Sequence, residues 1–159
     1  MNFKNLIKTV SFLVVLVFSV STVKAQGRND VIKAYNEGAN LVQTDPEGAI
    51  KAFEKAVDLS KQVGDSAADL SQKAIKVLPG LYYSVAARAF TAKKPASEII
   101  SATKKAIAIS VKYDNPSIKQ NADLLLIKAY NNMAIDYFSK NDYQNALVTF
   151  DSVLIINPD

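Results

Sequence analysis

The sequence predicts an all-α protein, an α-α superhelix of about three helix-turn-helix repeats. Three observations support this fold class. Apolar residues recur at the helical spacing i, i+3, i+4, i+7 in successive segments. Short polar turns rich in Lys, Asn, Asp and Pro separate these segments. The apolar pattern itself repeats every 47 to 50 residues, which indicates repeated two-helix units.

The first element in chain order is a predicted signal peptide, residues 1–25. Lys4 and Lys8 precede an apolar run over 10–20 that only serines interrupt. Small residues follow this run, and we expect the signal peptide to be cleaved after Ala25. This leaves a domain of residues 26–159, exported to the periplasm or the extracellular space. The apolar run has about half the ~20 residues that a membrane-spanning helix needs, so an uncleaved signal anchor is the weaker alternative.

The composition narrows the classes of function. The chain contains no cysteine and no histidine, which excludes disulfides, thiolate and imidazole metal ligands, and a cysteine nucleophile. Loss of the signal peptide lowers the basic count from 19 to 16, against 15 acidic residues, so the charge does not favour nucleic acid. The glycines form no phosphate-binding loop and no serine lies in a nucleophile elbow. We therefore predict that the protein is not an enzyme and has no cofactor or metal.

The first predicted unit spans residues 29–62. Its first helix, expected over about 30–43, crosses the second either at Gly38 or at Ala39. We prefer Gly38, because a residue without a side chain allows close helix approach. Asp45 is the expected N-cap of the second helix. That helix carries an apolar stripe of Ala49, Ile50, Phe53, Ala56, Val57 and Leu59.

The second and third predicted units span 66–112 and 116–158. Their first helices share one stripe: Tyr83, Ala86, Ala87 and Phe90 match Tyr130, Met133, Ala134 and Tyr137. Helical patterns over 66–78 and 117–128 predict that both first helices are extended at their N-terminal ends. Pro79 is expected to kink the first of these extensions. The last helix carries a stripe of Tyr143, Ala146, Leu147, Phe150, Val153 and Leu154.

The last unit resembles a tetratricopeptide repeat. The aromatic residues of its first helix, Ala146-x-x-x-Phe150 in its second helix and Pro158 at its end follow the pattern of that family. Val153 departs from it, where the family usually has Ala. The period exceeds the family's typical length of about 34 residues, as extended first helices would require. The resemblance implies a solenoid that binds a protein or peptide on the concave face of its first helices.

That resemblance also implies a partner-binding groove. Its candidate residues, placed by spacing, are Tyr35, Ser84, Arg88, Lys128, Asn131 and Phe138. The carboxylate clamp of some family members is absent, because Asn132 occupies the place of an arginine. A mixed apolar groove with Arg88 and Lys128 suits an extended or helical peptide. Tyr82 also lies beside the packing stripe, where an aromatic side chain either packs on a neighbouring repeat or lines a groove.

Two further surfaces are candidates. A basic patch of Lys93, Lys94, Lys104 and Lys105 is either a solvated helix surface or a contact for an acidic partner or the headgroups of a membrane. The last helix also carries more apolar residues than one packed face requires. We therefore expect a C-terminal interface at Leu154, Ile155 and Ile156. Either the natural chain continues beyond Asp159, or this end packs on another copy or on a partner.

The function predicted first is a non-enzymatic interaction module or scaffold of the bacterial envelope. The alternative is a membrane-associated structural subunit, held by an uncleaved signal anchor and the basic patch. A third hypothesis, a small apolar ligand bound between repeats, requires a closed cavity that open solenoids seldom form.

Mass spectrometry of the mature protein tests the export prediction. We expect Gln26 as the first residue, because Val23 and Ala25 are the small residues that signal peptidase reads. A mature chain that retains residues 1–25 would instead support the anchored alternative.

Overall fold

The computed structural model describes residues 27–156, and within them the chain is helical, without strands. The first helix covers 27–41. It is followed by α2 (Pro46–Val63), the short 3-10 turn η1 (Asp65–Ala67), α3 (Ala68–Thr91), α4 (Ala96–Lys112), α5 (Pro116–Ser139) and α6 (Tyr143–Ile156). The predicted signal peptide, its cleavage site after Ala25, and Pro158 lie outside the described residues. The all-α prediction is confirmed.

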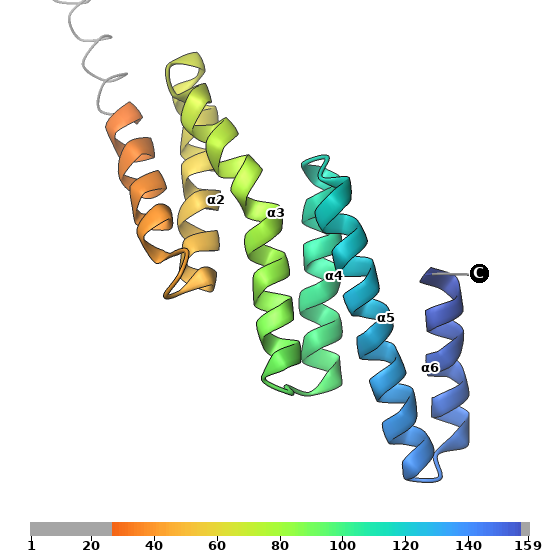
Figure 1. The fold of residues 1–159 in the computed structure, drawn as a ribbon. Helices are drawn as coiled ribbons and strands as arrows, with labels where there is room; N and C mark the ends of the chain where they lie inside the picture. Colours follow the sequence, from red (N-terminus) through yellow and green to blue (C-terminus); the bar gives the residue numbers. More distant parts are fainter. Residues whose placement is uncertain (1–26, 157–159) are drawn as a thin grey trace, which may run out of the picture.

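The helices stand in a row, and the described chain runs along it from the first helix to α6 (Figure 1). Each helix packs against its neighbours in sequence, since α2 contacts α3, α3 contacts α4, α4 contacts α5, and α5 contacts α6. A further contact joins α3 to α5, the first helices of successive pairs. This stacking of neighbouring pairs is the arrangement of a helical repeat solenoid, as the sequence predicts.

The two later first helices are long. Both α3 and α5 contain 24 residues, whereas the first helix of the first pair covers only 27–41, in agreement with the predicted extensions. Pro79 lies in the middle of α3 and is buried. The helix changes direction along its length (Figure 1), as expected where proline removes a backbone hydrogen bond. The helix over 27–41 ends two residues before its predicted end at Gln43, because 42–44 form the turn that leads into α2.

Side-chain caps explain where the second and fifth helices begin. Asp45 is the N-cap of α2, and its Oδ1 accepts a hydrogen bond of 2.9 Å from the amide of Gly48. Asn115 caps α5 in the same way, with its Oδ1 3.1 Å from the amide of Ile118. A proline follows each cap at the first helical turn, where its missing N–H costs nothing.

The ends of α3, α4 and α5 share one closing turn. A non-glycine residue with positive φ follows each helix: Lys93 (52°), Asp114 (51°) and Asn141 (62°). The next amide then bonds to a carbonyl five residues back, over 3.0 Å, 2.8 Å and 2.9 Å respectively. These bonds satisfy carbonyl groups that the helix end leaves free. The same reversal therefore recurs at three successive turns.

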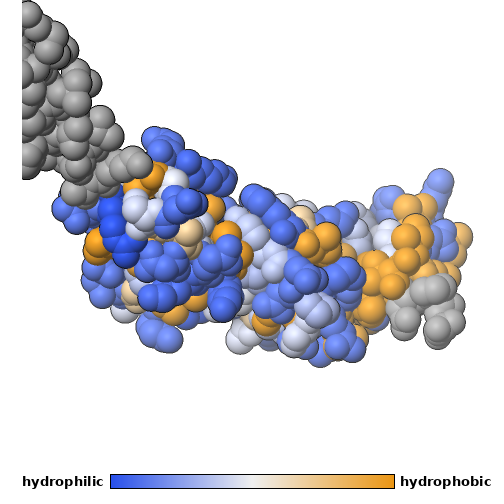
Figure 2. Space-filling view, turned by 90° about the horizontal axis from the view of Figure 1, so that it is seen from above, coloured by the Kyte–Doolittle hydropathy of each residue, from blue (hydrophilic) through white to orange (hydrophobic). Residues whose placement is uncertain are grey.

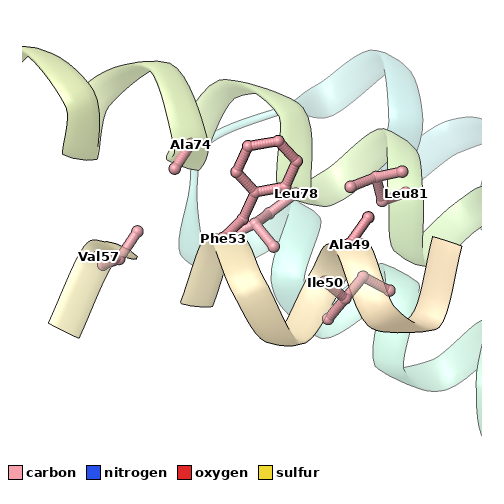
Figure 3. Close-up of a cluster of buried hydrophobic side chains, with 7 residues drawn as sticks. All are labelled: Ala49, Ile50, Phe53, Val57, Ala74, Leu78 and Leu81. Carbon is pink, nitrogen blue, oxygen red and sulfur yellow. The ribbon is translucent and has the colours of Figure 1, made fainter. Parts of the chain in front are cut away.

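Phe53 of α2 lies at the centre of the main core cluster. It is 1% exposed and packs with Ala49, Ile50 and Val57 of its own helix and with Ala74, Leu78 and Leu81 of α3 (Figure 3). The Tyr35 ring approaches it edge-on, with ring centroids 5.4 Å apart. A methyl group added at Gly38 would lie 2.9 Å from Cγ of Phe53. Phe53 thus joins the first helix to α3, and the predicted crossing at Gly38 is confirmed.

The second pair replaces this phenylalanine with a threonine. Thr103 of α4 stands at the position equivalent to Phe53 and is fully buried. Its hydroxyl donates to the carbonyl of Ile99 at 2.7 Å, and Ser110 donates to Ala106 at 2.7 Å. Because these hydroxyl groups are satisfied within their own helix, their burial leaves no polar group without a partner.

Alanine substitutions at two helical glycines test this packing. We expect Gly38→Ala to destabilise the protein by about 1–3 kcal/mol, because its Cβ would overlap the buried Phe53 ring. The matched control, Gly80→Ala in α3, places its Cβ where no atom lies within 4 Å. It should stabilise the protein by up to about 1 kcal/mol through helix propensity alone. Urea unfolding measures both. A Gly38→Ala protein as stable as the control would contradict the close crossing.

Candidate functional site

A cleft of about 620 Å³ extends across α2, α3 and α4. Because α3 packs on both other helices, it forms the middle of the cleft with Tyr82, Val85 and Ala89. From α2 the cleft receives Pro46, Glu47, Ile50, Lys51 and Glu54, and from α4 it receives Glu98, Ser101, Ala102 and Lys105. Apolar side chains therefore lie between two helices that also present charges of both signs.

Tyr82 and Glu54 form the one hydrogen bond between two side chains across the α2–α3 side of this cleft. The phenol oxygen donates to Oε1 of Glu54 at 2.7 Å. Partial burial, and secondly the hydrogen bond and the negative charge of Glu54, raise the pKa of Tyr82 well above its usual range. The phenol therefore stays protonated and acts as a fixed hydrogen-bond donor that ties α3 to α2.

Arg88 also lines the cleft. Its guanidinium donates to the backbone carbonyl of Gln43, in the turn after the first helix, at 3.3 Å. Lys94, near the same end of the cleft, pairs with Glu98 at 2.9 Å, and both side chains are about half exposed. Such exposed pairs contribute little to stability. They leave this end of the cleft lined by solvent-exposed charges of both signs.

Arg88 is the one of the six predicted groove residues that lines this cleft. Tyr35 packs edge-on against Phe53 and so contributes to the core. Ser84 is half-buried on α3. The predicted groove runs along first helices, whereas α2 and α4, two second helices, form much of the cleft.

The three groove residues predicted on α5 lie outside the cleft. Lys128 is exposed and Asn131 is half-buried. Phe138 is 60% exposed, and its ring lies edge-on to Tyr143 with centroids 5.3 Å apart. A single groove through all six residues therefore stays a prediction.

The four lysines of the predicted basic patch point to different surfaces. Lys104 lies 5.7 Å from the centre of the Tyr130 ring, towards α5. Lys105 lines the cleft together with Lys94. Lys93 and Lys94 line another cavity, of about 560 Å³, between α3, α4 and α5. Successive residues of a helix point about 100° apart, so the adjacent Lys104 and Lys105 point to different surfaces of α4.

The last helical pair exposes many apolar side chains. Leu154 and Ile155 of the predicted C-terminal interface are 59% and 84% exposed, while Ile156 is half-buried. Figure 2 shows hydrophobic residues gathered at the right-hand end of the row, where α6 lies. In the segment 135–155 the exposed large apolar residues are Ile135, Phe138, Tyr143, Leu147, Val148, Phe150, Leu154 and Ile155.

The apolar stripe of α6 is only partly covered. Leu147 is 65% and Phe150 is 40% exposed. Only Ala146 and Thr149 of α6 are buried, because α5 covers one side of this helix and no described helix covers the other. The apolar stripe of α6 therefore covers more of the helix surface than α5 can bury.

Some residues of the cleft were not predicted from the sequence as site residues. Ile50 and Glu54 gave no signal of their own, because helical spacing assigns Ile50 to the core and Glu54 to a solvated surface. The cleft forms only when α2 and α4 both pack on α3. Tyr82 was identified as an aromatic residue beside the packing stripe, and it does line a cleft.

Over residues 27–156 we find no cluster of acidic side chains that could hold a metal ion. None of the helices described there is long and apolar enough to cross a membrane. No family model, no curated protein and no solved structure matches the chain.

Tyr82→Phe tests the hydrogen bond in the cleft. At neutral pH we expect a loss of about 1 kcal/mol from the missing bond to Glu54. The pKa of Tyr82 lies above its ordinary value of 10.0 in the folded state, so the unfolded chain releases that proton first. The unfolding free energy of the natural protein should therefore fall as the pH rises above 10.0, and Tyr82→Phe should lack this component.

Chemical denaturation at a series of pH values makes this measurement. Tyr143→Phe is the matched control, because it removes an exposed phenol outside the cleft. If Tyr82→Phe and Tyr143→Phe lose stability in parallel with the natural protein at high pH, Tyr82 does not have the proposed role.

Proposed function

We propose that this chain is a non-enzymatic protein-binding module, a short array similar to tetratricopeptide repeats that holds a segment of a protein partner. The observation that carries the proposal is the cleft across α2, α3 and α4, with apolar residues between helices that present charges of both signs. An extended or helical peptide has the matching chemistry, since it offers apolar side chains in its middle and polar groups at its margins.

The charges of the cleft favour a polypeptide over a small metabolite. Lys51, Arg88 and Lys105 lie in the same cleft as Glu47 and Glu54. A partner with both acidic and basic side chains can pair with both sets, whereas a small ion would meet one attractive and one repulsive group. The cleft is also open, and small molecules usually bind where most of their surface is enclosed.

Composition supports the non-enzymatic part of the proposal. Without histidine or cysteine, the chain lacks the side chains that most often transfer protons or attack substrates near neutral pH. The tyrosine of the cleft has a pKa far above neutrality, which suits a fixed donor and not a general base.

Two further features support the likeness to tetratricopeptide repeats and the envelope location. The closing turns at Lys93 and Asn141, after the first helices α3 and α5, recur with the same hydrogen bond, as expected of a repeated unit. Export rests on the charge and apolar pattern of residues 1–25. Proteins of the bacterial envelope are therefore the class in which to seek the partner.

Charge reversal in and outside the cleft tests this function. A partner is first captured from the native envelope and identified, and its affinity is then measured by titration. We expect Arg88→Glu to weaken binding about tenfold, because a rim cation becomes an anion within the contact. Thermal stability should change little, because Arg88 is exposed and its contact with Gln43 is a single long hydrogen bond.

Lys128→Glu is the matched control, because it reverses the same charge on α5, outside the cleft. Affinity within about twofold of the natural protein is expected. Equal weakening by both variants would move the binding surface to the groove along the first helices. No weakening by either would contradict both surfaces.

A further inference from the structure

The end face of the array is a continuous apolar stripe formed by Phe138 of α5 and Tyr143, Leu147, Phe150 and Leu154 of α6. These side chains are 60%, 56%, 65%, 40% and 59% exposed, respectively. The four residues of α6 follow the spacing i, i+4, i+7, i+11 and so share one side of the helix. The edge-on contact between Phe138 and Tyr143 continues the stripe onto α5.

This stripe has the pattern of a helix-docking surface. When the second helices are aligned on Ala49 and Ala146, Leu147, Phe150 and Leu154 of α6 match Ile50, Phe53 and Val57 of α2. The three residues of α2 are 7%, 1% and 4% exposed, since α3 packs on them. The end face therefore continues the interface that joins one helical pair to the next, but no described helix covers it.

We propose that a second copy of this chain covers the end face, with the two α6 helices packed against each other about a two-fold axis. In a two-fold contact residue i of one copy meets residue j of the other, and residues at the axis meet their own copies, so charges near the axis would face like charges. The 14 residues of α6 include a single charged residue, Asp151. It lies at the edge of the stripe, one residue after Phe150, and so leaves the centre of the contact uncharged.

The opposite end of the array, at the first helix, is not suited to pack on the end face of another copy. The outer surface of the first helix exposes Asn29, Lys33, Asn36, Glu37 and Asn40. An apolar stripe placed on this polar surface would remove water from charged groups without pairing them. Head-to-tail stacking of copies is therefore disfavoured, and among residues 27–156 the surface that best complements the end face is the end face itself.

The area of the surface is consistent with a reversible dimer. The five side chains of the end face expose on the order of 500 Å² of apolar surface, taking ~200 Å² for each large side chain when it is free. A stable interface needs about 800 Å² from each partner. The neighbouring Ile135, which is 60% exposed, extends the surface towards that value.

Sedimentation of the full chain tests the proposal. We expect a monomer–dimer equilibrium between about 1 and about 100 µM, the range in which an interface of this size is half-associated. The double variant Leu147→Glu/Leu154→Glu should remain monomeric with unchanged helix content, because both residues are largely exposed. Val111→Glu is the control, since Val111 is 61% exposed but lies on α4. It should dimerise like the natural protein.

Introduced thiols locate the contact. The natural chain has no cysteine, so Leu147→Cys carries a single thiol near the proposed two-fold axis. Treatment with diamide should convert it to a disulfide-linked dimer, while Val111→Cys stays monomeric. A natural protein that remains monomeric at about 100 µM, together with a Leu147→Cys variant that does not cross-link, would overturn the proposal. These variants leave the cleft intact, so binding of the captured partner reports separately on the proposed function.

Discussion

The packing of one helical pair on the next is the interaction on which the remaining structure depends. No helix here can bury its apolar stripe alone, and short isolated helices are only marginally stable in water. Phe53 shows how the problem is solved, because the same buried ring contacts the first helix through Tyr35 and Gly38 and contacts α3 through Leu78. The second helices α2 and α4 thus each have two neighbours, their own first helix and the first helix of the next pair. Both candidate surfaces follow from this rule.

The cleft and the end face both result from the stacking of helical pairs, the cleft within the array and the end face at its last helix. Where a second helix has a neighbour on each side, as in the stretch from α2 to α4, the packed first helix leaves an open cleft between two second helices. Where the next first helix is not present among the described residues, as at α6, the docking stripe itself is exposed. The two surfaces share no residue. If the proposals hold, dimerisation at the end face would leave two clefts free, and a partner with two copies of its binding segment would gain avidity without any new contact.

The backbone turns explain how the repeat persists although its core residues change. Thr103 replaces phenylalanine at the centre of the second pair. Nevertheless, α3, α4 and α5 are each followed by a residue in the left-handed conformation and by the same type of hydrogen bond. Reversal of the chain therefore does not depend on which side chain fills the interface. Caps at Asp45 and Asn115, each followed by proline, set the starts of the helices just as locally. Local chemistry determines where helices begin and end, while the interfaces tolerate exchange of large and small residues.

The sequence by itself determined the fold class, the pairing of helices, the long first helices and the close approach at Gly38, because helical periodicity, capping residues and glycine act within a few residues along the chain. It also indicated that the C-terminal end is too apolar for one packed face. Only the tertiary structure decided that Lys104 lies beside Tyr130 while Lys105 lines the cleft, that Tyr82 bonds to Glu54, and that Leu147 and Phe150 are exposed. The reason is geometric: a periodic pattern shows which residues share one side of a helix, but only the number and positions of neighbouring helices decide whether that side is buried, lines a cleft or faces solvent.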